Sequence, residues 1–193
     1  MNEVDELLVC LRCDLADVPD LPLPAGVEVR TMDPGDPADV RRWLEVHNAA
    51  FGRAWDEENH RLAMIENPVV VVDRTYLAEQ AGEVVATASI GRFRRNPDVG
   101  LGHYLAVHPS SRGLGLATAM SSLRYRVLAE QVAVAEAQTH LHRVGSLRAH
   151  FACGFRPKAG VDEWNSLDPT DGPLRVEADR RLNALYDAWR AGR

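Results

Sequence analysis

The stretch Leu105-Ala-Val-His-Pro-Ser-Ser-Arg-Gly-Leu-Gly-Leu-Ala-Thr118 decides the fold of this chain. An apolar strand runs into a short turn, and an arginine and two glycines then open a long amphipathic helix. Glycine lets a ligand approach the backbone closely, and the unpaired N–H groups of a helix N-terminus attract anions. Arg112 adds a positive charge beside them. The stretch therefore predicts a cradle for a diphosphate group.

Two other phosphate-binding loops fit this stretch less well. A Walker A loop needs a lysine and then a serine or threonine after its last glycine, whereas Gly115 is followed by Leu116 and Ala117. A Rossmann loop has a glycine or alanine where this chain has Thr118, and it lies in the first βαβ unit of its fold. We therefore expect neither nucleotide hydrolysis nor dinucleotide binding.

The hydrophobic pattern on both sides of the loop predicts a mixed α/β domain. Alternating apolar residues predict strands near residues 7–13, 27–32, 69–78, 84–93, 100–107, 132–140 and 163–167. Helical spacing predicts helices over residues 37–51, 56–66, 116–127 and 143–153, and a last helix from about residue 173. Arg124 falls outside the apolar stripe of the third of these helices. Short turns between residues 69 and 107 predict an antiparallel meander that leads into the loop.

Composition limits the classes of protein to which the chain can belong. With 193 residues and a net charge of −6, it suits one domain without a general attraction to nucleic acid. We find no apolar stretch long enough to cross a membrane and no basic secretory start, so we expect a cytoplasmic protein. The three cysteines are an odd number, which argues against a disulfide framework. Cys10 and Cys13 fit best as small buried side chains on a strand.

Two motifs resemble those of a known family. The pattern Arg112-x-x-Gly115-x-Ala117 resembles motif A of the GNAT superfamily of acyl-CoA-dependent N-acyltransferases, written R/Q-x-x-G-x-G/A. The stretch from Arg143 to Phe155 resembles the later signature of that family, in which a helix runs into Gly-Phe. With the order of strands and helices, the resemblance covers about residues 27–167.

The resemblance implies the GNAT fold, a mixed and mostly antiparallel central sheet flanked by helices. We expect this domain over residues 27–168, after an N-terminal arm over residues 1–26. Residues 169–193 are expected to form a C-terminal helical extension. A homodimer through the apolar face of that extension is a further prediction.

The resemblance also implies acetyl-CoA as the acyl donor. Residues implied to hold it are Leu105 and Val107 along the strand edge, Arg112, Gly113, Leu114, Gly115, Ala117 and Thr118 around the pyrophosphate, and Arg143 at the start of the second motif. We expect no metal ion. His140 and His142 lie two residues apart, but the sequence shows no third or fourth ligand converging on them.

Acylation of an amine requires removal of a proton, stabilisation of an oxyanion and a proton for the departing thiolate. Many members of the family supply the last proton from a tyrosine at the position that His150 occupies here. The family's usual strand carboxylate is also missing, which leaves His103 and Tyr104 as candidate bases. They point to opposite faces of a regular strand, so one of them should face the substrate cleft unless a bulge alters the alternation. All three also fit ordinary structural roles. Weaker candidates are Glu45, His47 and His60.

The sequence thus predicts an N-acetyltransferase that transfers acetyl from acetyl-CoA to a primary amine of a small molecule or peptide, by direct attack in a ternary complex. The alternative is an acyl-CoA-binding sensor or scaffold, because the usual tyrosine and carboxylate are absent. The negative net charge favours a cationic acceptor through steering. Trp43, Phe51 and Trp55 fit either core positions or an apolar acceptor pocket. Neither nucleic acid nor membrane is expected as a partner.

Overall fold

The computed structural model describes residues 3–159 and 172–193, within which seven strands form one sheet in the order β2-β3-β4-β5-β6-β1-β7. The strands are β1 (Leu8–Asp14), β2 (Val27–Thr31), β3 (Val70–Gln80), β4 (Glu83–Phe93), β5 (Val99–Val107), β6 (Val134–His140) and β7 (Arg156–Lys158). The α-helices are α1 (Pro37–Phe51), α2 (Glu57–His60), α3 (Leu116–Leu128), α4 (Val144–Ala152) and α5 (Pro173–Ala191). Shorter helical turns are η1 (Glu3–Glu6), η2 (Leu15–Asp17), η3 (Arg61–Ile65) and η4 (Pro109–Ser111).

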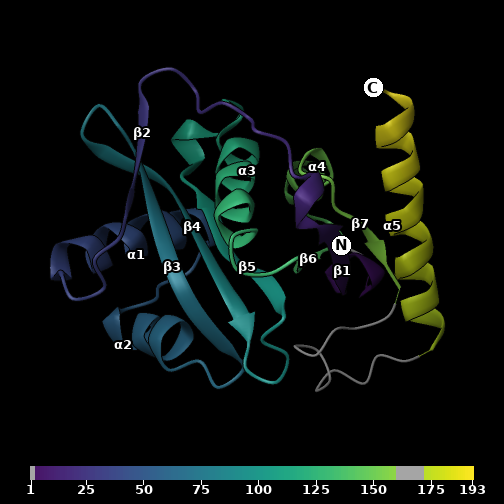
Figure 1. The fold of residues 1–193 in the computed structure, drawn as a ribbon, viewed down its shortest axis with the longest axis horizontal. Helices are drawn as coiled ribbons and strands as arrows, with labels where there is room; N and C mark the ends of the chain where they lie inside the picture. Colours follow the sequence, from purple (N-terminus) through teal and green to yellow (C-terminus); the bar gives the residue numbers. More distant parts are fainter. Residues whose placement is uncertain (1–2, 160–171) are drawn as a thin grey trace.

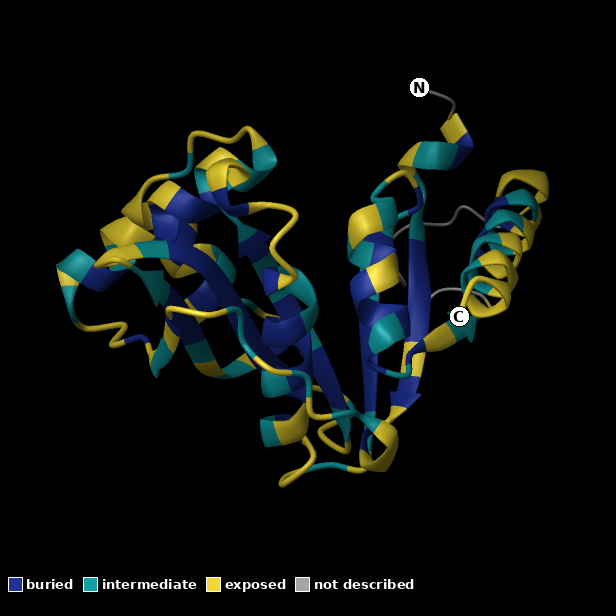
Figure 2. Cartoon of the chain, turned by 90° about the horizontal axis from the view of Figure 1, so that it is seen from above, coloured by how far each residue is buried: buried dark blue, intermediate teal, exposed yellow. Residues whose placement is uncertain are grey.

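The sheet is mixed and mostly antiparallel, as predicted, and its one parallel pair, β5 and β6, is short. The pairing of β5 with β6 covers Val99 to Leu101, opposite Val134 to Glu136. Beyond Leu101 the two strands separate, and Figure 2 shows the two parts of the sheet diverging as the arms of a V. The first arm of the sheet consists of β2 to β5, and the second arm consists of β6, β1 and β7 (Figure 1).

The N-terminal strand belongs to the second arm. β1 pairs with β6 along its whole length, from Leu8 opposite His140 to Asp14 opposite Val134, and with β7 on its other side. Its apolar side chains are buried in the core of this arm. All three cysteines of the chain are buried and free, which for Cys10 and Cys13 agrees with the predicted role as small buried side chains.

Helices α1 and α3 cover opposite faces of the first arm. Tyr76 and Ala78 of β3 pack in one core cluster with Met120 of α3. Leu77, which lies between them, packs in another cluster with Trp43 of α1. Since neighbouring residues of a strand point to opposite faces, the two helices sandwich the sheet. Of the two interpretations of Trp43, the core position is therefore correct.

Local signals account for the helix boundaries. The Asp36 side chain accepts a hydrogen bond from the backbone N–H of Ala38, and Pro37 occupies the first helical position of α1. The predicted helix over 56–66 begins with a capping box at Asp56, is α-helical only over Glu57–His60 and continues as the π-helical turn η3.

The C-terminal part differs in detail from the prediction. The three-residue strand β7 was not predicted, because a segment this short with a proline in it has no periodicity. The strand predicted over 163–167 lies outside the described residues. Helix α5 packs its buried Ala178 and Leu182 against Phe151 and neighbouring core residues of the second arm. No helix within the described part of the chain is long and apolar enough to cross a membrane.

Candidate functional site

The glycine-rich loop has the backbone expected of an anion cradle. Strand β5 ends at Val107, and Gly113 and Gly115 take φ angles of +83° and +81° before α3 begins. Side chains rarely adopt this conformation, so the positions favour glycine. A Cβ atom at either glycine would meet no atom within 4 Å, which means that the space in front of the loop is open. No side chain caps the N-terminus of α3.

This loop forms one wall of a cavity of about 590 Å³. Residues predicted to bind the cofactor that line it are Leu105, Val107, Arg112, Gly113, Gly115, Ala117, Thr118 and Arg143. Leu114 differs from them, because its side chain is 52% exposed and is not part of the lining. The structure therefore brings together all but one of the residues that the resemblance assigns to acetyl-CoA.

Two arginines stand at the border of this cavity. The Arg112 guanidinium donates a hydrogen bond of 2.9 Å to the carbonyl of Ala50, near the end of α1, which holds it beside the loop. The Arg143 guanidinium lies 5.0 Å from the ring centroid of Phe51, in a cation–π contact. Burial lowers the pKa of Arg143, and this side chain also lines a second cavity.

A bulge interrupts β5 where the two arms of the sheet separate. On β4, Ala88 pairs with Leu105 and Ser89 pairs with His103, so Tyr104 has no partner across the ladder. Tyr104 has a φ angle of +37°. The ring centroids of His103 and Tyr104 are only 4.2 Å apart. The expectation that these two side chains point to opposite faces is therefore wrong, because the bulge breaks the regular alternation.

The second cavity, of about 230 Å³, lies between β5 and β6. The three predicted catalytic residues, His103, Tyr104 and His150, all line it. It shares four lining residues with the first cavity, namely Phe51, Leu105, Arg143 and Ser146. The two cavities are thus neighbouring parts of one region between the arms of the sheet.

His150 is buried on α4 in a defined hydrogen-bonding state. Its Nδ1 atom lies 2.8 Å from the carbonyl of Ser146 and must be the donor, since a carbonyl only accepts. In the neutral ring Nε2 then carries a lone pair, and it lies 3.1 Å from the hydroxyl of Tyr125. Burial, followed by the charge of Arg124, lowers the pKa of His150 to about 3. In this tautomer Nε2 has no proton to give to a thiolate, unlike the tyrosine of the family motif.

The second cavity contains other titratable groups, His47, His103 and Tyr104. His47 of α1 is fully buried, and neither of its ring nitrogens has a hydrogen-bond partner among the described residues. Burial lowers the pKa of His47 and of His103 to about 4, so both rings are neutral at physiological pH. Burial also raises the pKa of Tyr104, which keeps its phenol protonated. Of the other weaker candidates, Glu45 is exposed and His60 lines a different cavity.

Arg124 lines the second cavity, and the sequence pattern did not predict this. It is 1% exposed, although helical periodicity placed it outside the apolar stripe of α3. A Cβ atom at Gly102 of β5 would collide with the hydroxyl of Tyr125 and would lie 2.8 Å from Nη2 of Arg124. A glycine inside a strand pattern often marks such a close approach, so Gly102 was the signal that could have revealed this group.

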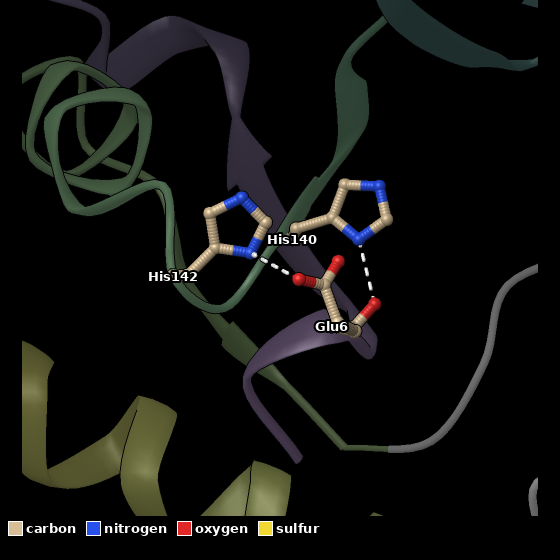
Figure 3. A group of neighbouring side chains, drawn as sticks. All are labelled: Glu6, His140 and His142. Atoms are coloured by element: carbon tan, nitrogen blue, oxygen red, sulfur yellow. Dashed lines mark hydrogen bonds and ion pairs between the residues drawn. The ribbon is translucent and has the colours of Figure 1, made fainter. Parts of the chain in front are cut away.

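The structure adds Glu6 to the pair of His140 and His142 that the sequence analysis considered, at the C-terminal end of β6. Figure 3 shows Glu6 of η1 beside His140 and His142, with one potential ligand atom from each within 4.8 Å of the others. The Nδ1 atoms of His140 and His142 lie 2.6 Å and 2.9 Å from the carbonyls of Glu6 and Asp5. These bonds use the Nδ1 protons to tether η1 to the second arm. The expectation of no metal ion stays a prediction.

Comparison with known proteins links this geometry to a family. A sequence profile of the acetyltransferase (GNAT) family matches residues 40–155. A mycothiol acetyltransferase of Sanguibacter keddieii is 32% identical over 155 residues, which cover 75% of this chain and 48% of that protein. A mycothiol acetyltransferase of Thermomonospora curvata is 32% identical over 118 residues, which cover 57% and 38%. The chain thus spans half or less of the length of these curated relatives.

Solved structures share the fold. A GCN5-related N-acetyltransferase from Sphaerobacter thermophilus superposes with a TM-score of 0.62 at 23% identity, over 78% of this chain and 48% of that one. A tandem GNAT protein from the clavulanic acid biosynthesis pathway gives a TM-score of 0.60 at 20% identity, over 78% and 50%. At these identities the likeness extends to the fold alone.

Proposed function

Because the chain belongs to the GNAT family of acetyltransferases, we propose that it transfers an acetyl group from acetyl-CoA to a primary amine of a small molecule or peptide. The observation that carries this proposal is the adjacency of the two cavities. A phosphate-binding loop lines the first, a bulged strand with titratable side chains lines the second, and both include Leu105, Arg143 and Ser146.

In the proposed complex the pyrophosphate of acetyl-CoA binds at the N-terminus of α3, where the backbone N–H groups and Arg112 favour an anion. The pantetheine arm pairs with the β5 edge from Leu105 to Val107. This edge is available because the β6 ladder ends at Leu101. The acetyl group then lies near the bulge at Tyr104.

The proposed chemistry is a direct transfer. The amine nitrogen forms a bond to the thioester carbonyl carbon, the C–S bond breaks, and an amide and CoA are the products. In this proposal the neutral rings of His47 and His103, which line the second cavity, accept the proton that the amine loses as its nitrogen attacks, directly or through water. Tyr104 is positioned to return a proton to the thiolate. His150 is then a positioning residue that holds Tyr125 and the start of α4.

The second candidate function is an acyl-CoA-binding sensor without efficient turnover. The observation that favours it is the state of His150, which occupies the position of the family's usual acid. Its Nε2 lone pair faces the Tyr125 hydroxyl, and its pKa is lowered, so it is not a proton donor for the thiolate. Both candidate functions require acyl-CoA to bind in the first cavity, and they differ only in whether the acetyl group is then transferred.

One experiment tests both. Release of CoA from acetyl-CoA is measured against a broad amine panel, and acetyl-CoA affinity is measured by calorimetry. The relatives named mycothiol acetyltransferase make mycothiol-related amines a sensible part of that panel. Binding with turnover on at least one amine supports the enzyme. Tight binding without turnover on any amine supports the sensor, and lack of acetyl-CoA binding overturns both.

A further inference from the structure

The second cavity has a lining of one charge sign. Its charged side chains, among the residues that the structure describes, are Arg53, Arg124 and Arg143. The lining contains no aspartate or glutamate, although Glu6 interacts electrostatically with Arg143 from outside it. The whole chain, in contrast, has a net charge of −6. The cavity is therefore a local cationic site in an acidic protein, which is the arrangement expected of a binding site for an anion.

Arg124 is the most deeply buried of the three and has no acidic partner among the described residues. Its Nη1 atom lies 3.4 Å from the carbonyl of Ser89, and its Nη2 atom lies 3.1 Å from the hydroxyl of Tyr125 and 3.4 Å from Nε2 of His150. Its Nε atom has no hydrogen-bond partner. These three polar contacts are to uncharged groups, and two are longer than an ordinary N–H···O bond. The guanidinium also lies 4.7 Å from the ring centroid of Tyr125, in a cation–π contact.

A buried guanidinium without a counter-ion is costly, because arginine cannot lose its proton in a protein. The fold nevertheless makes room for this one, since only a glycine at position 102 lets Arg124 and Tyr125 approach β5. An anionic group of a ligand would offset that cost. Arg53 and Arg143 at the same cavity have no ion pair among the described residues and are held by cation–π contacts with Trp55 and Phe51.

We propose that the acceptor is an amine that also carries a carboxylate, and that Arg124 binds this carboxylate inside the second cavity. The inference rests on the proposed function, because it names the substrate class of that same site. The two oxygens of a carboxylate match the fork of the guanidinium. The expectation of a cationic acceptor, based on net charge, stays a prediction, and an amine that carries a carboxylate keeps the cationic amine.

Different arginines are available to the acceptor and to the acyl donor. Arg112 and the glycine loop line the first cavity, whereas Arg124 lines the second cavity and not the first. The pyrophosphate therefore has its own binding groups, and Arg124 remains for the acceptor. Tyr104 and the two neutral rings of His47 and His103 line the same cavity as Arg124. A carboxylate on Arg124 thus holds its amine near groups that can move a proton.

The test compares matched pairs of acceptors. Each amino acid of a panel, including β- and γ-amino acids, is assayed beside its carboxamide, and O-phosphoethanolamine is assayed beside ethanolamine. We expect kcat/KM for the best carboxylate to exceed that of its amide at least tenfold. In the Arg124→Met variant we expect this ratio to fall to about one. Equal rates for acid and amide in the wild type would overturn the proposal, and a preference for the phosphate would overturn its carboxylate part.

A matched control and a binding measurement complete the test. Arg126 lies on the same helix, pairs with Asp20 at the surface, and lines neither cavity. The Arg126→Met variant should keep the wild-type ratio. Thermal unfolding in the presence of CoA gives a readout without turnover. Carboxylated amines should raise the melting temperature of the wild type more than their amides do, and this difference should vanish in Arg124→Met.

The outcomes separate this inference from the proposed function. Turnover of amines without any preference for a carboxylate leaves the enzyme in place and overturns the role of Arg124. Arg124-dependent stabilisation by carboxylates without turnover supports the site and argues against the enzyme. The unliganded Arg124→Met variant should also melt at the same or a higher temperature than the wild type, because a buried unpaired charge is removed. A collapse of stability would show that the guanidinium is satisfied within the fold and would overturn the inference.

Discussion

The hydroxyl of Tyr125 donates a hydrogen bond to Nε2 of His150 across 3.1 Å, between two side chains that the fold buries together. The opposite ring nitrogen of His150 gives its proton to the carbonyl of Ser146. Both nitrogens are therefore engaged within the protein. This relationship makes His150 a group that orders α3 and α4 against each other.

We therefore expect His150→Gln to keep most of the activity. The glutamine amide offers both a donor and an acceptor, so kcat should stay within about tenfold of the wild type. Loss of hydrogen-bond geometry should lower the free energy of unfolding by about 1 kcal/mol. The measurements are steady-state kinetics and urea denaturation. A general acid contributes about 10²- to 10⁴-fold, so a loss of that size in a fully folded variant would contradict a positioning role.

Acid should destabilise the protein because of its buried neutral histidines. The pKa of His150 is lowered to about 3 in the folded state, whereas the unfolded chain takes up a proton near pH 6.5. Stability from this group is therefore complete above about pH 6.5 and decreases as the pH falls towards 3. Each such histidine should contribute a slope of about 1.4 kcal/mol per pH unit. Between pH 6 and 5, the His150→Gln variant should show a slope smaller by that amount, and an unchanged slope would contradict the burial of a neutral ring.

The glycine loop can be tested with a matched pair of substitutions. Gly113 of the loop and Gly82 of the β3–β4 hairpin have φ angles of +83° and +86°, and a Cβ atom would meet nothing within 4 Å at either position. Alanine at either site should cost about 1 kcal/mol of stability through backbone strain. Only Gly113→Ala should weaken acetyl-CoA binding, by about fivefold or more in calorimetry. Equal affinities in the two variants would argue against the cradle.

Tyr104→Phe tests the proposed acid. Removal of the hydroxyl should lower kcat about 10- to 100-fold and leave the affinity for acetyl-CoA unchanged, because the ring that packs in the cavity is kept. Since burial raises the pKa of Tyr104, any loss of the wild-type rate through its deprotonation should begin at a higher pH than for an exposed tyrosine. The control is Tyr186→Phe on α5, which packs against Phe151 away from both cavities. An unchanged kcat in Tyr104→Phe would remove Tyr104 from the mechanism.

The sequence predicted the features that local spacing controls. The strands of the meander, the caps of α1 and the glycine loop depend on residues within a few positions of one another. The place of β1 could not be predicted, because its partner residues on β6 and β7 are more than a hundred positions away in the chain. A bulge in β5 was an open alternative, but its position could not be predicted, because a tyrosine at position 104 gives no sign of a positive φ angle.

The cationic lining of the second cavity escaped prediction for a similar reason. Periodicity assigned Arg124 to the polar side of α3 on the assumption that this side faces water. In the structure that side faces the space where β5 and β6 separate, so a charged residue is buried without a break in the helical pattern. The spacing of residues identifies the apolar stripe of a helix, but it does not show whether the other faces of the helix contact water or protein.

The place of β1 also orders events during synthesis. Leu11 leaves the ribosome long before Ala137, its partner in the sheet. The meander from β2 to β5 can fold with α1 and α3 during this time, while β1 still lacks its pairing partner β6. A nascent chain that ends before β6 therefore carries the glycine loop and a bare β5 edge without the opposite wall. The cavity in front of the glycine loop also needs Arg143, Gly145 and Ser146, so it is complete only after β6 and the start of α4 have been synthesised.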